Sequence, residues 1–293
     1  LPGQIAYLRL LTFQENTGEQ VRAALKNLAA KDQALRGVIL DLRDNTGGLL
    51  TQAVEVLDAL VASGELVIVR SAMGRESEPA KPDLELPLSS AVVALINEES
   101  ASASEIVSGS VKYLERGLVL GRPSFGKGTV QLVKPGNFYG SELALKITIA
   151  EYLVAGDRSI QTAGVQPDLL LLPVELSNIA SVANYYDRER FERRREYAQV
   201  AHLPSAKHEK PRISGAAEGL QLRYLAGLRG PAGLGAGSEG PAALRDPEVR
   251  IAHEVAQRLV GETETAARRA RLAAVARDLS LAEDAAISCT TCS

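Results

Sequence analysis

Three serines alternate with alanines in one short segment, Ser100-Ala-Ser-Ala-Ser104, which follows an apolar run that ends at Ile96. Small residues between a strand and a helix let a substrate backbone approach closely, and the free N–H groups at a helix start can stabilise a developing oxyanion. A serine in such a turn is a candidate nucleophile for acyl transfer. Serine is also a common helix N-cap, so the residues alone leave both interpretations open for Ser100, Ser102 and Ser104.

A nucleophilic serine needs a base, and histidine is the usual one. All three histidines lie in the last third of the chain: His202, His208 and His253. Lysine is then the natural substitute, and Lys127 stands out in the segment Phe125-Gly-Lys-Gly-Thr-Val-Gln131. A lysine that accepts a proton near neutral pH must be desolvated. We therefore expect Lys127 to lie between apolar strands, with the neutral amide of Gln131 orienting its amine.

Two other motifs share this lysine. The run Gly121-Arg-Pro-Ser-Phe-Gly-Lys-Gly128 differs by one residue from the phosphate-binding loop of nucleotide-binding proteins, G-x-x-x-x-G-K-[ST]. Gly128 stands where that loop needs a hydroxyl for Mg²⁺, and a strand is expected where the loop needs a helix. The run Ser124-Phe-Gly-Lys127 matches the S-x-x-K motif of penicillin-recognising enzymes, which requires a helix that Pro123 and Gly126 oppose. Each alternative lacks a part that its chemistry requires.

Composition excludes several classes of function. Lys and Arg total 33 against 36 Asp and Glu, a net charge of −3, which argues against a nucleic-acid or anionic-membrane partner. The longest apolar stretches are too short for a membrane span. Both cysteines, Cys289 and Cys292, lie in the last five residues, so no Cys/His cluster can form in the first 200 residues. We expect no metal site and no cofactor, and we interpret the Cys-x-x-Cys pair as a terminal tail rather than a redox site.

The first 175 residues alternate between runs typical of strands and runs with helical spacing, which predicts an α/β core. Strands are expected over residues 5–12, 37–42, 66–69, 91–96, 118–120, 129–133 and 143–153. Helices are expected over residues 17–31, 49–61 and 102–114. Because the run 37–42 is almost entirely apolar, we expect it to be buried on both faces. The polar stretch 72–86, with Pro79 and Pro82, is expected to be a surface loop.

The sequence divides into four expected parts. A core over residues 1–175 is followed by a charged helix over 176–199, a Gly/Pro-rich linker over 200–245 and a helical extension over 246–293. Asp246-Pro247 is a typical helix start. The apolar face of that helix must be buried against the core or against a second copy of the chain, and we favour the core.

Three separated motifs resemble those of the C-terminal processing (tail-specific) serine peptidases, in the family's order and spacing. They are Leu40-Asp-Leu-Arg-Asp-Asn-Thr-Gly-Gly48, Ser100-Ala-Ser-Ala-Ser-Glu-Ile106 and Gly121-Arg-Pro-Ser-Phe-Gly-Lys-Gly-Thr-Val-Gln131. The resemblance extends from about Ile5 to Asp168. It implies that Ser102 is the nucleophile, Lys127 the base and Gln131 the residue that positions the base. It also implies that the oxyanion donors are the amides of Gly48 and Ala103.

The resemblance further implies a fold and a function. The fold would be a crotonase/ClpP-like spiral of β-β-α units, followed here by the helical extension. The function would be that of a serine endopeptidase that cleaves near the unstructured C-termini of protein or peptide substrates, in the periplasm or another exported compartment. The alternative is an inactive protease-like scaffold or binding module. Both a monomer and a homo-oligomer are consistent with the sequence.

Members of this family usually carry a PDZ domain before the core. The core of this sequence opens at Leu1, without Met. We therefore expect a fragment or a processed form in which the peptidase core lacks that domain.

Overall fold

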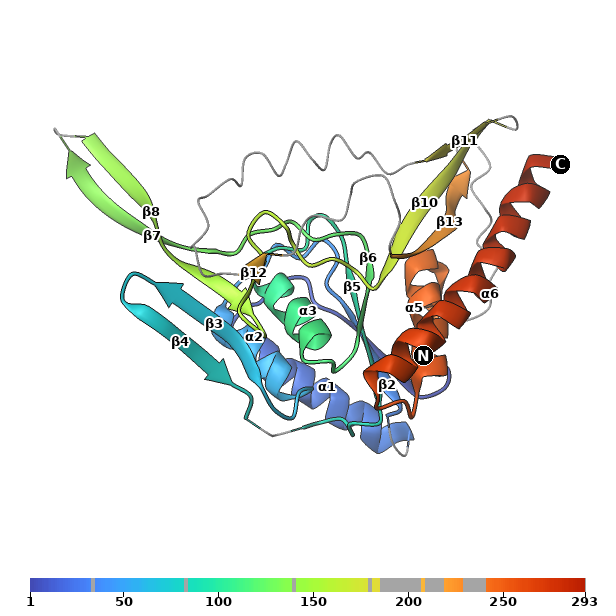
Figure 1. The fold of residues 1–293 in the computed structure, drawn as a ribbon, viewed down its shortest axis with the longest axis horizontal. Helices are drawn as coiled ribbons and strands as arrows, with labels where there is room; N and C mark the ends of the chain where they lie inside the picture. The colour runs from blue at the N-terminus through green and yellow to red at the C-terminus, as the bar shows by residue number, and fades with distance from the viewer. Residues whose placement is uncertain are drawn as a thin grey trace.

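The computed structural model describes residues 1–32, 35–81, 84–138, 141–178, 181–184, 207–208, 219–228 and 241–292. Two β-sheets and two groups of helices occupy this part of the chain (Figure 1). The mixed α/β class predicted from the sequence is confirmed. None of the helices in the described ranges combines the length and the apolar character that a membrane crossing requires.

The first sheet is mainly parallel. Its path runs through β1 (Ile5–Arg9), β2 (Gly37–Asp41), β5 (Ala91–Ile96), β6 (Leu118–Gly121), β10 (Leu169–Asn178) and β11 (Ser181–Asn184), with β13 (Leu220–Leu228) paired to β10. The strands β1, β2, β5 and β6 pair in parallel in that order. The carboxyl ends of β2, β5 and β6 therefore meet at one edge of the sheet.

Helices cover both faces of this sheet (Figure 1). One face carries α1 (Thr17–Asp32), α2 (Leu50–Asp58) and α3 (Ala103–Tyr113), and the other carries α5 (Pro247–Leu259) and α6 (Thr265–Cys292). Successive residues of a strand point to opposite faces. Val38 and Leu40 accordingly pack in the core with α1, α2 and α3, whereas Ile39 packs in the core with α5 and α6. The predicted burial of β2 on both faces is confirmed.

The second sheet is smaller and lies beside the α1–α3 layer. Its path runs through β12 (Lys207–His208), β9 (Arg158–Ser159), β8 (Ser141–Val154), β3 (Glu65–Ser71) and β4 (Gly74–Pro79), with β7 (Thr129–Phe138) paired to β8. Leu66 and Val67 of β3 join the hydrophobic core around α1–α3. Figure 1 shows the β7–β8 hairpin reaching out from the body of the molecule.

One expected loop contains a strand. Residues 74–79, inside the stretch predicted as a surface loop, form β4 and pair antiparallel with β3. Every residue of β4 except Ser77 is exposed, so the strand has no apolar alternation that a sequence pattern could detect. Its polar, charged side chains are typical of a sheet edge.

A strand also lies within the range expected as a linker. Leu220–Leu228 forms β13, in which Leu222 and Tyr224 are buried. The alternation of apolar residues at 220, 222 and 224 is short and leads into the Gly/Pro-rich run, so it is a weak strand pattern. Within the part expected as a charged helix, residues 176–178 and 181–184 lie in β10 and β11. The remainder of that helix, and most of the Gly/Pro-rich run, lie outside the described residues.

The helix expected after Asp246 is confirmed. The Asp246 side chain accepts hydrogen bonds from the N–H groups of Glu248 and Val249, at 2.9 and 3.2 Å, and Pro247 opens α5. The apolar face of α5 packs on the core, where Ile251 and Val255 are almost completely buried. The next helix, α6, begins at Thr265 and ends at Cys292, within the part expected as a helical extension.

Candidate active site

Three loops follow the carboxyl ends of β2, β5 and β6. We call them the glycine loop (residues 42–49), the serine turn (97–102) and the lysine loop (122–128). Because their strands are neighbours and parallel, the loops lie at the same edge of the sheet. This is the edge at which open α/β sheets commonly place their ligands.

The three serines of the serine turn and the start of α3 differ in their surroundings. Ser100 and Ser104 are both fully buried, and their hydroxyls donate to the carbonyl oxygens of Leu42 and Asn45, each at 2.8 Å. The side chain of Ser102 is only partly buried. Of the three, Ser102 alone donates its hydroxyl to no backbone carbonyl among the described residues, and its side chain faces the backbone N–H of Glu105 in a capping box.

The backbone of Ser102 is strained. It precedes α3 with φ +56° and ψ −114°, a region that residues with a side chain rarely adopt. Such conformations cost about 1–3 kcal/mol and persist where the surroundings hold them. Here the Ser102 N–H donates to Oε2 of Glu105 at 2.8 Å.

Glu105 is completely buried and joins the serine turn to the lysine loop. Its Oε2 also accepts from the N–H of Lys127 at 2.8 Å. Its Oε1 accepts from the Ser124 hydroxyl and from the Gly126 N–H, both at 2.6 Å. Burial raises the pKa of the Glu105 carboxyl, and the four donated hydrogen bonds act against that rise. The backbone N–H groups of the candidate nucleophile and the candidate base therefore donate to the same carboxylate oxygen.

The sequence motifs predict no role for Glu105. The signal was present, because Ser102-x-x-Glu105 has the spacing of a capping box, in which a glutamate accepts from the N–H of the N-cap residue. The further bonds to the lysine loop are tertiary contacts that no local pattern reveals.

The glycine loop lies directly against the serine turn. A Cβ added to Gly47 would lie 2.9 Å from Cβ of Ser102 and 3.1 Å from N of Ala103. The loop is held there by Asn45, whose side chain accepts from the Gly47 N–H at 2.9 Å. Within the described residues, the N–H groups of Gly48 and Ala103 have no hydrogen-bond partner. The Ala103 amide directly follows Ser102, and the Gly48 amide belongs to the loop that Gly47 brings against the serine turn.

Lys127 does not lie where the sequence predicted. Its side chain is exposed rather than desolvated between apolar strands. The reason is that its backbone N–H points inward to Glu105, and its neighbours Gly126 and Gly128 are buried. Gln131, at the start of β7, is also exposed. Among the described residues, no hydrogen bond joins the Lys127 amine to Ser102 or to Gln131.

The lysine loop is fixed by its backbone. The N–H of Gly128 donates to Oε1 of Gln161 at 2.7 Å, and its carbonyl accepts from Tyr152 at 2.6 Å. On the other side, the N–H of Phe125 donates to the carbonyl of Ser100 at 2.9 Å. The loop therefore has a defined path, although the lysine side chain at its tip is open to solvent.

The two alternative motifs fail on geometry. Thr129 begins strand β7 directly after Gly128, whereas a phosphate-binding loop needs a helix there. Ser124 is fully buried and its hydroxyl donates to Glu105, so it cannot act as the nucleophile of an S-x-x-K motif.

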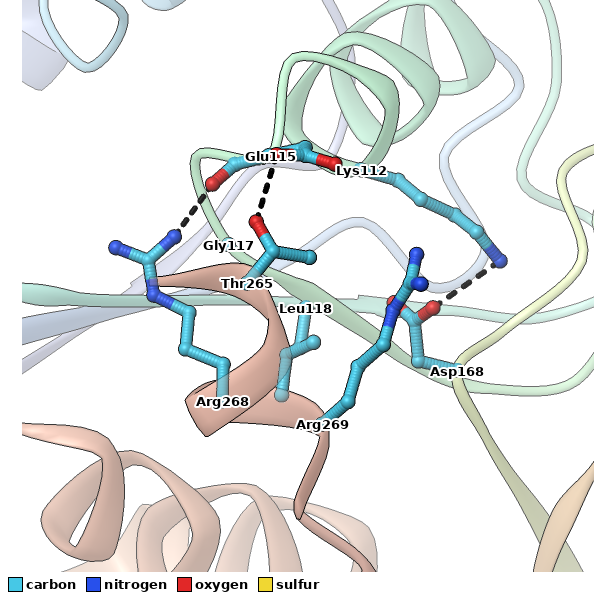
Figure 2. Close-up of a pocket in the computed structure, with 8 residues that line it drawn as sticks. All are labelled: Lys112, Glu115, Gly117, Leu118, Asp168, Thr265, Arg268 and Arg269. Carbon is cyan, nitrogen blue, oxygen red and sulfur yellow. Dashed lines mark hydrogen bonds and ion pairs between the residues drawn. The ribbon is translucent and has the colours of Figure 1, made fainter. Parts of the chain in front are cut away.

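A small hollow lies elsewhere, between the end of α3 and the start of α6 (Figure 2). Its free volume is about 10 Å³, room for one water molecule. Lys112 and Asp168 pair across it at 3.2 Å, and Thr265 donates to the Glu115 carboxylate at 2.8 Å. None of the candidate site residues lines this hollow. Among the described residues, no three His, Cys, Asp or Glu side chains are grouped to hold a metal ion.

Comparisons with known proteins point to one family. The sequence model of Peptidase family S41 matches residues 4–171. A carboxy-terminal-processing protease of Bartonella bacilliformis is 40 % identical over 172 residues, which are 58 % of this chain and 39 % of that protein. The chloroplastic C-terminal processing peptidase of Tetradesmus obliquus is 34 % identical over 183 residues, 61 % of this chain and 38 % of that protein.

A solved structure agrees with these sequences. The photosystem II D1 C-terminal processing protease superposes with a TM-score of 0.52 and 33 % identity, over 58 % of this chain and 44 % of that one. The chain spans about two fifths of the length of the two curated relatives. The segment that contains α5 and α6 lies beyond the residues that the family model matches.

Proposed function

Because the chain belongs to peptidase family S41, we propose that it is a serine endopeptidase in which Ser102 is the nucleophile and Lys127 the base. The observation that carries this proposal is the strained, partly exposed Ser102 beside two unpaired amides, while Ser100 and Ser104 are buried with their hydroxyls engaged. A nucleophile, an oxyanion site and a lysine on a tethered loop are the groups that acyl transfer requires.

The acylation step uses the groups in this order. Ser102 Oγ attacks the scissile carbonyl carbon as its proton passes to the Lys127 amine. The N–H groups of Gly48 and Ala103 donate to the oxyanion of the tetrahedral intermediate. Lys127 then gives the proton to the leaving amine as the C–N bond breaks, which leaves an acyl ester on Ser102. Water, deprotonated by Lys127, hydrolyses this ester and restores the free serine.

The proposal requires a movement of the lysine side chain. Catalytic hydrogen bonds are often long or absent without substrate and form only in the complex. The loop backbone is tied to Glu105, so the proposed movement is a change in the Lys127 side-chain rotamers that brings the amine towards Ser102. A bound peptide that covers the site would desolvate the amine, and Gln131 would orient it.

The substrate class is proposed from the relatives. The two curated relatives are named for processing C-termini, so we propose protein or peptide substrates with unstructured C-termini. An exported location, which the resemblance implies, is part of the same proposal.

A fluorophosphonate probe tests the nucleophile, because it labels only activated serines. We expect wild-type protein to be labelled on Ser102, and the Ser102→Ala variant to take no label. The matched control is Ser108→Ala, which removes a buried hydroxyl that donates within α3 and should keep the label. Label on Ser100, Ser104 or Ser124 would overturn the assignment.

One observation favours a second candidate function. The exposed Lys127 amine, with no bond to Ser102 among the described residues, is compatible with a protease-like scaffold that binds peptides without cleaving them. A wild-type protein that binds C-terminal peptides but takes no fluorophosphonate label would support the scaffold and exclude the peptidase.

A further inference from the structure

The start of α5 carries two carboxylates that bind arginines at the edge of the candidate active site. Asp246 accepts from both terminal nitrogens of Arg43, at 2.9 and 3.2 Å. Glu248 accepts from Arg43 at 2.8 Å, through Oε2. Arg43 is also paired with Asp41 through two further bonds, at 2.7 and 2.8 Å. One guanidinium is thus enclosed by three carboxylates, two of which come from a segment about 200 residues later.

Glu248 is the more deeply buried of the two, at 3 % exposed. Its Oε1 accepts from Arg122 and, at 2.6 Å, from the Tyr224 hydroxyl. Arg122 in turn donates to Glu98 at 2.9 Å. A single buried carboxylate therefore links two arginines from different loops, and through one of them a second acid.

These partners belong to the three loops of the candidate site. Arg43 lies in the glycine loop, four residues before Gly47. Arg122 opens the lysine loop, and Glu98 lies in the serine turn, four residues before Ser102. The carboxylates of α5 are thus connected to each of the loops that carry a proposed oxyanion donor, the base and the nucleophile.

The energetics make this connection consequential. Arg43 and Arg122 are largely removed from water, and a buried guanidinium without a partner is strongly unfavourable. If one carboxylate of α5 were neutralised, the arginines would move towards remaining acceptors or towards solvent. Either movement shifts the part of the glycine loop or of the lysine loop that carries the arginine. Misplacement of a reacting group by about 1 Å can cost on the order of 10²-fold in rate.

We propose that Asp246 and Glu248 are positioning residues of the active site, which hold the glycine loop, the serine turn and the lysine loop in register through Arg43 and Arg122. The inference rests on the proposed function and adds to it a requirement for a segment beyond the matched family region. It also gives α5 a role besides covering the sheet.

The test compares two carboxylates that are equally buried. Glu248→Gln keeps the size of the side chain and removes the charge that binds both arginines. The control Glu283→Gln neutralises a carboxylate that is 5 % exposed and pairs with Arg250, at 2.7 Å, between α5 and α6, away from the three loops. We measure fluorophosphonate labelling rate, peptide kcat and KM, and thermal stability for both variants.

We expect both variants to lose thermal stability, and only Glu248→Gln to lower the labelling rate and kcat, by at least about tenfold. A Glu248→Gln variant that labels as fast as Glu283→Gln at a temperature where both are folded would overturn the inference. Should Glu248→Gln not fold, Asp246→Asn replaces it, because Asp246 is partly exposed at 40 % and asparagine is also a good helix N-cap. Asp246→Asn should slow labelling as well, and an unchanged rate would again overturn the inference.

Amide hydrogen exchange separates failure of the inference from failure of the proposed function. In Glu248→Gln, and not in Glu283→Gln, we expect faster exchange over residues 42–49, 97–102 and 122–128. If wild-type protein takes no label, the proposed peptidase activity fails, and the exchange data still decide the inference. Unchanged exchange in these loops would contradict it.

Discussion

Three serines of similar sequence surroundings acquire different chemistry from what their hydroxyls contact. Ser100 accepts from the N–H of Asn97 at 3.0 Å and donates to Leu42, so its oxygen is used on both sides. Ser104 is bonded to the glycine loop through Asn45. Ser102 holds the strained position at the helix start. At the scale of single residues, the proposed nucleophile is therefore the serine whose hydroxyl donates to no interior carbonyl among the described residues.

Glu105→Gln tests the residue that joins both halves of the site. Glutamine has one acceptor oxygen, whereas each oxygen of Glu105 receives at least one backbone N–H. Whichever way the amide is turned, its NH₂ group faces an N–H donor. We expect the free energy of unfolding to fall by about 2 kcal/mol or more, and labelling at Ser102 to slow, as measured by denaturant titration and probe kinetics.

The control for Glu105→Gln is Ser124→Ala, which removes one of the four donors and leaves the three backbone N–H bonds in place. The Ser124 hydroxyl also accepts from the N–H of Val165 at 2.6 Å, so the variant loses stability as well, but its loss of reactivity should be smaller. Equal reactivity in Glu105→Gln and wild-type protein would show that the four bonds do not position Ser102 or Lys127.

At the scale of elements, the site depends on loops that begin where parallel strands end. The glycine loop, the serine turn and the lysine loop are irregular, and hydrogen bonds among them replace those of regular structure. Gly47 approaches Ala103 so closely that a side chain at position 47 has no room. The contact between the two loops therefore tolerates little displacement.

Gly47→Ala tests the contact between the glycine loop and the serine turn. The added Cβ would lie 2.8 Å from the Ala101 carbonyl oxygen and 2.9 Å from Cβ of Ser102, at a φ of +104°. The nucleophile and the Ala103 amide must shift. Since loss of one oxyanion donor costs about 10²–10³-fold in rate, we expect labelling at Ser102 to fall by about that factor.

Gly74→Ala is the matched control for Gly47→Ala. Gly74 has a similarly unusual φ of +133°, but nothing lies within 4 Å of an added Cβ. It should carry the backbone strain without the effect on the site, so its labelling rate should equal that of wild-type protein. Equal rates for the two alanine variants would contradict the proposed geometry.

At the scale of the whole molecule, the main sheet is covered on both faces by helices from opposite ends of the sequence. The α5 helix completes one hydrophobic core, and its first turn completes a network of charges around Arg43. Burial and hydrogen bonding to Asp41 raise the pKa of Tyr7 to about 12. Burial alone would raise the pKa of Asp41, but the hydrogen bonds and charge of Arg43 lower it overall.

This lowered pKa predicts a dependence of stability on pH. A carboxyl whose pKa is lower in the folded protein stabilises it above the unfolded value of 3.8 and loses that contribution as the pH falls through the folded value. We expect Asp41→Asn to reduce the free energy of unfolding at pH 7 by about 3 kcal/mol. The difference from wild-type protein should narrow below pH 3.8, as followed by urea titration.

The control for Asp41→Asn is Asp278→Asn, which removes an exposed ion pair with Arg258. Exposed pairs contribute less than about 1 kcal/mol, so this variant should show a small difference at every pH. A difference for Asp41→Asn that stays constant down to pH 2 would mean that its carboxylate charge is not what stabilises the network.

Many of the helices and strands could be predicted from the sequence, because local residue patterns determine them. The apolar runs of β2 and β5 and the Asp246-Pro247 helix start are such patterns. The strand β4 was not predicted from the sequence, because its residues are polar and its stability comes from pairing with β3. The strand β13 was not predicted, because its alternation of apolar and polar residues is short and leads into the Gly/Pro-rich run.

The site was predictable in its residue types and only in part in its contacts. The motifs located Ser102, Lys127 and Gly48 on loops, and their roles remain predictions. Local patterns could not show that Lys127 is exposed, because that depends on where its backbone N–H finds an acceptor. They also could not show that Glu248 reaches Arg43, because the two residues are 205 positions apart.

The most direct test of the Ser102–Lys127 assignment is the rate at which fluorophosphonate labels Ser102 in Lys127 variants. Lys127→Ala removes the amine, and Lys127→Arg keeps a cation that stays protonated. Loss of a general base costs about 10²–10⁴-fold, so we predict a loss in that range for both variants, while the exposed Lys26→Ala control labels at the wild-type rate. Labelling of folded Lys127→Ala or Lys127→Arg at close to the wild-type rate would contradict the assignment.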